Sequence, residues 1–252
     1  MRHLGEISRI HRYPVKSFQG ESLLRTEVGM FGLPGDRMHV FVEPAKGDRH
    51  LSAKQRPALL GYSAVYEGGQ TGDSAAVQVT SPEGELFRWD ESLLDEIARI
   101  TELNLSLMSF SVHHEGLAAV DAEPILITTE ASLTLLQELH GLSIDIRRFR
   151  PNLVLRSESL APFEELGWIG SRLLIGDVEL RVIKGCGRCS MVNVDPDHLD
   201  YDPSLLTLLA KQFDGCFGVY AQVIRTGSLG VQDQVVMMAE KEEMNRFASA
   251  GH

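Results

Sequence analysis

Short segments in which hydrophobic and polar residues alternate, separated by turns, run through most of the chain. The first covers residues 4–13, and such alternation indicates a β-strand because successive side chains of a strand point to opposite faces. Glycine-rich and proline-rich turns such as 32–35 and 81–84 bound these segments. The other predicted strands cover 22–29, 38–42, 59–66, 75–79, 86–89, 124–128, 152–155, 173–176, 178–183, 217–225 and 230–236.

Helical spacing appears in only a few places. Asp90 precedes acidic residues and apolar residues four apart, which predicts a helix over 90–97. Thr129 and Gly141 are typical first and last residues for a second helix, with leucines three apart between them. A third helix is predicted over 205–211, and a polar helical segment over 237–248.

Many short strands with few short helices favour a mainly β or α+β fold, barrel-like and mostly antiparallel, over an alternating βαβ fold. Residues 103–117 have no clear pattern, so we place a domain boundary there. The predicted organisation is a domain over 1–112, a second over 113–238, and a polar helical tail over 239–252.

Composition narrows the class of protein. The 252 residues are 43% hydrophobic, enough for one large core or two modest ones. No apolar run approaches the roughly 20 residues that cross a bilayer, and the first residues do not resemble a signal peptide. We therefore expect no membrane span and a cytoplasmic location. A net charge of -11 argues against a nucleic-acid partner.

Several common sites lack their motifs. The chain has no G-x-x-x-x-G-K-[ST], no G-x-G-x-x-G and no G-x-S-x-G. Three cysteines do not suggest a disulfide framework, and their spacing does not match an iron–sulfur cluster. The candidate chemistry is therefore elsewhere.

The segment Cys186-Gly187-Arg188-Cys189 is the strongest candidate. Zinc would need two further ligands, for which Cys216 and His198 are the nearest choices. A thioredoxin-like pair would open a helix, whereas 190–194 is predicted to be extended. A single thiolate could instead bind a soft or intermediate metal beside Arg188, since a guanidinium favours the charged sulfur. Two structural thiols remain the fourth interpretation.

Basic residues on turns add a second feature. Arginine forks match phosphate oxygens two at a time, and lysine acts as a point charge. Each alone suits an exposed surface or, for Arg37, a turn-stabilising pair with Asp36. Together they are consistent with one phosphate-bearing cofactor held by Lys16, Arg37, Arg147, Arg148, Arg150 and the amide of Asn152.

The joint order and spacing of these motifs resembles the MOSC proteins, relatives of the C-terminal domain of molybdenum-cofactor sulfurase. The likeness is greatest to the branch of the mitochondrial amidoxime-reducing component and its bacterial counterparts, and it covers nearly the whole chain. The segments that carry it are Tyr13-Pro-Val-Lys-Ser17, Gly35-Asp-Arg37, Arg148-Phe-Arg-Pro-Asn152, Pro162-Phe-Glu-Glu-Leu-Gly-Trp168, Cys186-Gly-Arg-Cys189, Val194-Asp-Pro-Asp197 and Phe217-Gly-Val-Tyr220.

The resemblance implies an N-terminal β-barrel-type domain followed by a MOSC β-barrel domain. It also implies a molybdenum cofactor whose metal is bound by Cys189, the catalytic residue. The family as a whole is further associated with pyridoxal phosphate. The residues that would contact the molybdenum cofactor are Lys16, Ser17, Arg37, Asp121, Arg150, Asn152, Gly187, Arg188 and Tyr220.

Some positions depart from the family pattern. Gly187 stands where relatives have serine, which reduces a side-chain hydrogen bond to a backbone one. Ala122 and Glu123 replace small hydroxyl residues, and Glu123 would repel a phosphate if it pointed inward. His198-Leu199 replaces the usual Thr-Gly, which we interpret as a loop variant.

The activity implied is the two-electron reduction of N-hydroxylated compounds such as amidoximes and hydroxylamines, with loss of water. Some bacterial relatives carry a fused ferredoxin domain, and we expect none here. We therefore expect an external donor: a ferredoxin, a flavodoxin or a cytochrome b5-like reductase system. The alternative is a carrier that binds the cofactor or its sulfur without turnover of its own.

Overall fold

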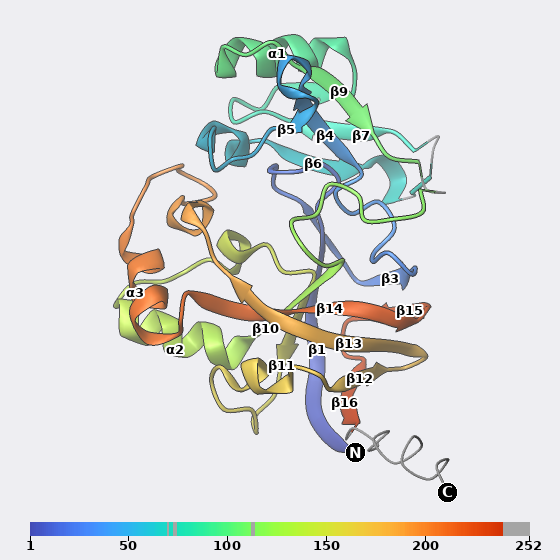
Figure 1. The fold of residues 1–252 in the computed structure, drawn as a ribbon, viewed down its shortest axis with the longest axis vertical. Coiled ribbons are helices and arrows are strands. Elements are labelled where there is room, and N and C mark those ends of the chain that lie inside the picture. Colours follow the sequence, from blue (N-terminus) through green and yellow to red (C-terminus); the bar gives the residue numbers. More distant parts are fainter. Residues whose placement is uncertain (70, 73–74, 112–113, 239–252) are drawn as a thin grey trace, which may run out of the picture.

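A closed barrel of seven strands forms one half of the molecule (Figure 1). The computed structural model describes residues 1–69, 71–72, 75–111 and 114–238. Pairing of the first strand with β11 closes the ring, and β10–β11 is its parallel pair. In ring order the strands are β1 (Arg2–Arg12), β11 (Leu153–Arg156), β10 (Ile125–Thr129), β14 (Cys216–Arg225), β13 (Val178–Gly187), β12 (Arg172–Ile175) and β16 (Gln234–Met238).

The predicted fold class is confirmed, because these strands alternate inward apolar residues that fill the barrel. The single strand expected over 22–29 is wrong. The chain bends at Leu24, which is 84% exposed, and the segments on either side pair differently. β2 (Glu21–Leu23) extends the sheet beside β1, whereas β3 (Arg25–Val28) pairs with β15 (Gly227–Gly230).

Two small sheets and one helix make up the other half of the molecule (Figure 1). One sheet has the order β5 (Arg49–His50), β4 (His39–Glu43), β9 (Ser106–Ser109). The other has the order β6 (Ser63–Tyr66), β7 (Val77–Thr80), β8 (Leu86–Arg88). The strand expected over 59–66 starts only at Ser63, because Pro57–Gly61 form a 3₁₀ turn. β9 lies in the region that had no clear pattern.

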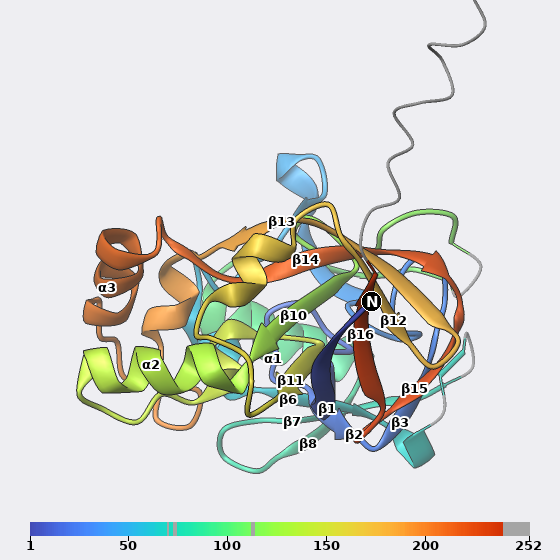
Figure 2. The same ribbon diagram turned by 90° about the horizontal axis from the view of Figure 1, so that it is seen from below.

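Helix α1 (Glu91–Thr101) starts where its cap predicts, since the side chain of Asp90 accepts a hydrogen bond from the Ser92 amide. Helices α2 (Glu130–His140) and α3 (Ser204–Gln212) lie together on one side of the barrel (Figure 2). Thr129 caps α2, and Gly141 ends it in the left-handed conformation. Both helices pack on a core that includes Phe149 and Phe217.

Strand β16 continues to Met238, with Met237 paired to both β1 and β12 and Met238 paired to β12. The helix expected over 237–248 is therefore wrong at its first residues, because two neighbouring strands bond to this backbone. The rest of it, and the tail expected over 239–252, lie outside the described residues. The boundary between 112 and 113 stays a prediction; in space, β1 from the N-terminus completes the barrel with later strands.

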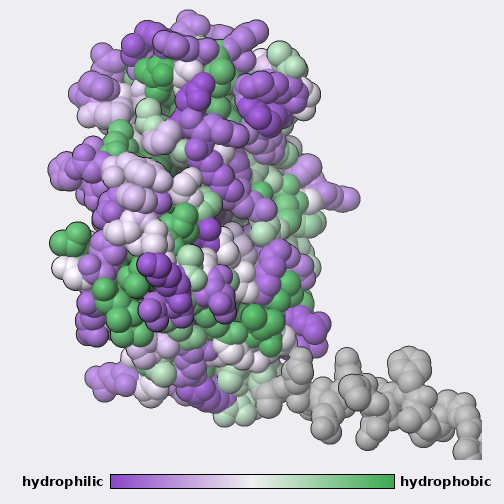
Figure 3. Space-filling view, turned by 60° about the vertical axis from the view of Figure 1, so that its left-hand side comes forward, coloured by the Kyte–Doolittle hydropathy of each residue, from purple (hydrophilic) through white to green (hydrophobic). Residues whose placement is uncertain are grey.

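No helix within the described ranges combines the length and apolar character that crossing a bilayer requires. On the face shown in Figure 3, hydrophilic residues predominate and hydrophobic ones occur in small separate groups.

A buried carboxyl group, Glu165, joins the turn Glu164–Trp168 to the start of α2. Its side chain is 0% exposed and accepts a hydrogen bond of 2.7 Å from the hydroxyl of Ser132. Burial raises the pKa of Glu165, and the hydrogen bond from Ser132 only partly offsets this rise. The neighbouring Glu164 is different, because a hydrogen bond from Arg2 lowers its pKa.

We expect Glu165→Gln to become progressively more stable than the parent as pH rises from about 4.5. The folded parent binds this proton more tightly than the unfolded chain, so its stability falls as pH rises from the unfolded pKa through the raised folded one. Glu164→Gln should show the opposite trend, because the lowered pKa of Glu164 stabilises the folded parent at higher pH. Urea unfolding between pH 4 and 8 measures the difference in unfolding free energy between the parent and each variant. A difference between the parent and Glu165→Gln that does not change with pH would contradict a raised pKa of Glu165.

Candidate functional site

A cavity of about 380 Å³ lies where loops of the half that contains the two small sheets meet the barrel. This volume falls within the range of small-molecule sites. Of the residues predicted from the sequence to contact a cofactor or metal, all that the family resemblance implies line it. They are Lys16, Ser17, Arg37, Asp121, Arg150, Asn152, Gly187, Arg188, Cys189 and Tyr220. Their roles stay predictions, but the structure brings all of them together.

Three of these residues have a left-handed backbone. The φ angles are 71° for Ser17, 53° for Arg37 and 55° for Arg150. This region is sparsely populated by residues other than glycine, and such conformations gather at ligand sites. Arg150 adopts it because it ends the 3₁₀ turn Ile146–Phe149. The turn thereby directs the Arg150 side chain back toward Tyr13.

The ring of Tyr13 lies against two guanidinium groups. Its centroid is 4.7 Å from the Arg37 carbon and 4.3 Å from that of Arg150. Arg37 forms an ion pair with Asp36, as the turn-stabilising alternative predicts, and donates to the carbonyl of Arg150 at 3.2 Å. Arg150 donates to the carbonyl of Phe18 and has no carboxylate partner among the described residues.

Burial and the neighbouring Arg37 lower the pKa of Arg150 to about 10. One of its terminal nitrogens, Nη2, is buried without a hydrogen-bond partner in the described structure. A buried cation with an unused donor is costly unless an anion contacts it. Arg150 is therefore suited to a bound anionic group.

Lys16 and Ser17 follow β1 in the sequence and line the same cavity. The Lys16 ammonium donates to the Asp121 carboxylate and to the Ala119 carbonyl, both at 2.7 Å. Burial lowers the pKa of Lys16, and Asp121 opposes this shift. The Ser17 hydroxyl oxygen accepts from the Ala53 amide at 3.0 Å, which leaves its O–H able to donate.

Asn152 has a structural task that the sequence did not reveal. Its side-chain oxygen accepts from the Leu126 amide at 3.1 Å, and its nitrogen donates to the His11 carbonyl at 3.3 Å. The amide thus joins β10 to β1. A contact with a cofactor remains a prediction, and it would use the second N–H of the same amide.

The cysteine loop is arranged differently from the expectation. Arg188 Nη1 donates to the sulfur of Cys186 at 2.7 Å, so the guanidinium contacts Cys186 and not Cys189. Cys186 is 1% exposed, whereas Cys189 is partly exposed and lines the cavity. Burial raises the pKa of Tyr220, and its contact with the Cys186 side chain adds to the rise. Tyr220 and Cys186 therefore lie together in the wall of the cavity.

The segment after Cys189 was expected to be extended and is instead a 3₁₀ turn, Ser190–Asn193. The Val192 amide donates to the Cys189 carbonyl at 3.1 Å, and the side chain of Val192, a residue of this turn, is fully buried. Packing of Val192 thus overrides the β-favouring sequence. Within the described ranges, no group of three or more His, Cys, Asp or Glu residues is arranged to hold a metal ion.

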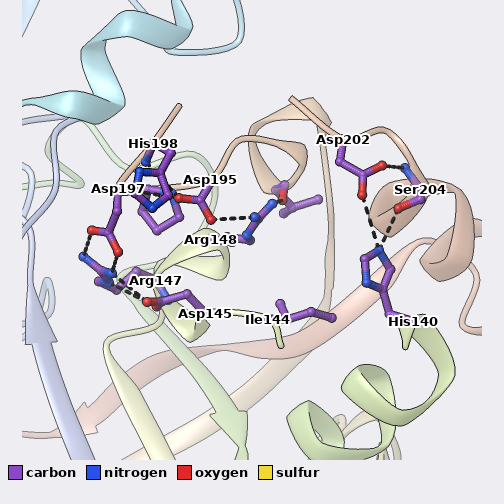
Figure 4. Close-up of polar contacts among 12 residues, drawn as sticks. His140, Ile144, Asp145, Arg147, Arg148, Asp195, Asp197, His198, Asp202 and Ser204 are labelled. Carbon is purple, nitrogen blue, oxygen red and sulfur yellow. Dashed lines mark hydrogen bonds and ion pairs between the residues drawn. The ribbon is translucent and has the colours of Figure 1, made fainter. Parts of the chain in front are cut away.

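Arg147 does not line the cavity, contrary to the expectation that it joins the phosphate set. Figure 4 shows it between two carboxylates, with Nη2 at 2.7 Å from Asp145 and 2.7 Å from Asp197. Arg148 does line the cavity and pairs with Asp195 at 2.8 Å. These ion pairs hold the arginine segment against the loop that follows the cysteines. Arg147 therefore fixes the position of this loop relative to the arginine segment.

Sequence reasoning missed two cations of the cavity, Lys54 and Lys184. Lys184 was detectable, because it lies two residues before Cys186 on β13 and alternate residues of a strand share a face. Lys54 gave no specific signal. Glu123 also lines the cavity, and its carboxylate accepts from Gln222 at 2.9 Å.

The charge of the cavity is strongly positive in a net-acidic chain. Seven cations line it against two carboxylates, those of Asp121 and Glu123. Lys16, Arg37 and Arg148 each have a carboxylate partner. The four that have none within the described structure are Lys54, Arg150, Lys184 and Arg188. These donors and the Cys189 thiol fit a group that carries a phosphate and a thiophilic metal.

Comparison with known proteins adds independent information. A model of the MOSC domain matches residues 112–236, and a model of the MOSC N-terminal beta barrel domain matches residues 4–129. Mitochondrial amidoxime reducing component 2 of Bos taurus is 30% identical, with 95% of this chain and 85% of that protein covered. Molybdenum cofactor sulfurase of Drosophila mojavensis is 29% identical over 54% of this chain and 17% of that protein.

Among solved structures, the YUAD protein from Bacillus subtilis has a TM-score of 0.53. It is 11% identical, and the match covers 94% of this chain and 97% of that one. At this identity the likeness shows a shared fold alone.

Proposed function

The chain belongs to the MOSC family, and from this premise we propose that it is an oxidoreductase that reduces N-hydroxylated compounds. Its similarity to amidoxime reducing components over most of their length supports a reaction of this class. The finer parts of the proposal are a molybdenum cofactor in the cavity, coordination by Cys189, and an external electron donor of ferredoxin, flavodoxin or cytochrome b5 type. A cytoplasmic location stays a prediction.

The main support for the cofactor is one observation. A partly exposed cysteine, Cys189, shares a cavity with two arginines that have no carboxylate partner in the described structure, Arg150 and Arg188. A thiolate suits a soft metal, and guanidinium forks suit a phosphate. One cofactor that carries both groups would satisfy both sets.

Each residue has a defined task under this proposal. Cys189 would ligate the metal, while Arg150, Arg37 and the Ser17 O–H would hold the phosphate and the pterin. The bound cofactor would supply the two-electron oxygen-transfer chemistry. Tyr220 lines the same cavity as Cys189, and its O–H would donate a hydrogen bond toward the substrate oxygen.

The overall reaction balances when the external electron donor is included. An amidoxime takes up two electrons and two protons, its N–O bond breaks, and the products are an amidine and water. The electrons come from the external donor, and the protons come from solvent through the mouth of the cavity.

Turnover tests the proposal directly. Protein from a host that makes molybdenum cofactor is supplied with a reduced dye and benzamidoxime, and benzamidine is measured by chromatography. We expect benzamidine to form with matching oxidation of the dye, and no product from protein made in a cofactor-deficient host. Cofactor-loaded protein that never oxidises the dye with any amidoxime or hydroxylamine would refute the activity.

The alternative of a cofactor or sulfur carrier has support from one contact. Cys186 lines the same cavity, and Arg188 donates to its sulfur. A guanidinium favours a charged sulfur such as a persulfide. Sulfur carriage predicts one added sulfur on the intact protein by mass spectrometry, whereas the reductase is distinguished by turnover.

A further inference from the structure

Two lysines at the mouth of the cavity are not needed to explain the cofactor. Lys54 follows β5 in the half that contains the two small sheets, and Lys184 lies on β13 of the barrel. Both are exposed, both line the cavity, and neither has a carboxylate partner in the part of the chain that the structure describes. They therefore leave positive charge at the entrance.

The charge count separates these lysines from the inner residues. Four cations of the cavity have no carboxylate partner among the described residues, and a phosphate monoester carries about two negative charges at neutral pH. Arg150 would meet that charge together with Arg37 and the Ser17 O–H, and Arg188 already donates to the Cys186 sulfur. Lys54 and Lys184 are not among the residues that would hold the cofactor under the proposed function.

The two carboxylates of the cavity do not pair with these lysines in the described structure. Asp121 forms its ion pair with Lys16 at 2.7 Å, and the charge of Lys54 acts on it without an ion-pair contact. Glu123 accepts a hydrogen bond from the neutral Gln222 and forms no ion pair with either lysine in the described structure. Lys184 lies opposite Tyr220 on the neighbouring strand, so the two side chains share a face. An anionic group held by Lys184 would therefore lie beside the hydroxyl that would contact the substrate oxygen under the proposed function.

We propose that Lys54 and Lys184 bind an anionic group of the substrate, so that the preferred substrates are N-hydroxylated compounds that carry a carboxylate or a phosphate. This inference rests on the proposed function and names its substrate class. Lysine suits the task because an ammonium on a flexible stem accepts an anion from several directions. The remaining length of the substrate places its N–OH group deeper, toward Cys189.

The experiment compares two substrates that differ by one charge, 4-carboxybenzamidoxime and benzamidoxime. Parent, Lys54→Gln/Lys184→Gln and the control Lys211→Gln are loaded with cofactor and assayed with a dye as donor. Lys211 is an exposed lysine of α3 outside the cavity. We expect the ratio of kcat/KM values, carboxylated over neutral, to fall about 3- to 30-fold in the double variant only. Molybdenum content should equal that of the parent.

Other results would overturn the inference. An unchanged ratio removes the role in specificity, and loss of molybdenum from the double variant assigns the lysines to the cofactor. A defect that appears only with an acidic protein donor assigns them to that partner. If neither amidoxime is turned over, the proposed function fails separately. Calorimetric binding of 4-carboxybenzamidine then decides: weaker binding by the double variant supports the lysine site, and equal affinity overturns it.

Discussion

Replacing Cys189 by alanine should remove molybdenum from the purified protein and reduce turnover of benzamidoxime by more than about 100-fold. Cys189 is the partly exposed thiol of the cavity, whereas Cys186 is buried and already has Arg188 as its partner. A bound metal requires a deprotonated and accessible sulfur. Elemental analysis of parent and variant from a host that makes the cofactor measures the first effect, and dye oxidation measures the second.

The other cysteines provide the controls for this result. Cys216 does not line the cavity, so Cys216→Ala should keep its molybdenum. Cys186→Ala removes the sulfur that Arg188 contacts and tests whether the two cysteines have distinct roles. Retention of molybdenum in Cys189→Ala together with its loss from Cys186→Ala would transfer the ligand role to Cys186.

Local sequence signals correctly predicted the helices whose capping residues bond to backbone amides a few positions away. Asp90 and Thr129 both cap helices where expected, because each side chain bonds to a backbone amide within three residues. The barrel class followed from the many short strands. The residues of the predicted site could be named because their motifs occur together, and the structure places them around one cavity, with the exception of Arg147.

What failed depended on contacts between distant segments. Arg147 could not be separated from Arg148 by sequence, since the carboxylate of Asp197 that engages it comes from a later loop. The direction of Arg188 toward Cys186 follows from the path of β13, and the left-handed backbone of Arg150 follows from how its turn ends. Secondary-structure propensities do not predict such features, because tertiary packing determines them.

The second large effect should come from Arg150, whose removal is expected to lower cofactor affinity about 10- to 100-fold. That range corresponds to losing a hydrogen bond between a guanidinium and a charged phosphate. Arg150→Ala protein should therefore contain little molybdenum after gel filtration. Arg150→Lys keeps the charge without the fork and should retain an intermediate amount. Molybdenum per chain, measured by elemental analysis, ranks the three proteins.

The same substitution should leave the cofactor-free protein about as stable as the parent, which separates binding from folding. Arg150 is a buried cation beside Arg37, and its pKa is lowered to about 10 because the folded state disfavours its charge. Losing that repulsion offsets the lost contacts with Tyr13 and Phe18. Arg150→Gly provides the matched control, since glycine also relieves the left-handed backbone.

Urea unfolding of protein from a cofactor-deficient host should then show Arg150→Ala within about 1 kcal/mol of the parent and Arg150→Gly at least as stable as Arg150→Ala. Both variants should still fail to retain molybdenum when the cofactor is supplied. Unchanged molybdenum in either variant would refute the phosphate role. A charge that is kept for a ligand lowers stability until that ligand binds. A large loss of stability in both variants would therefore show that Arg150 is a structural residue.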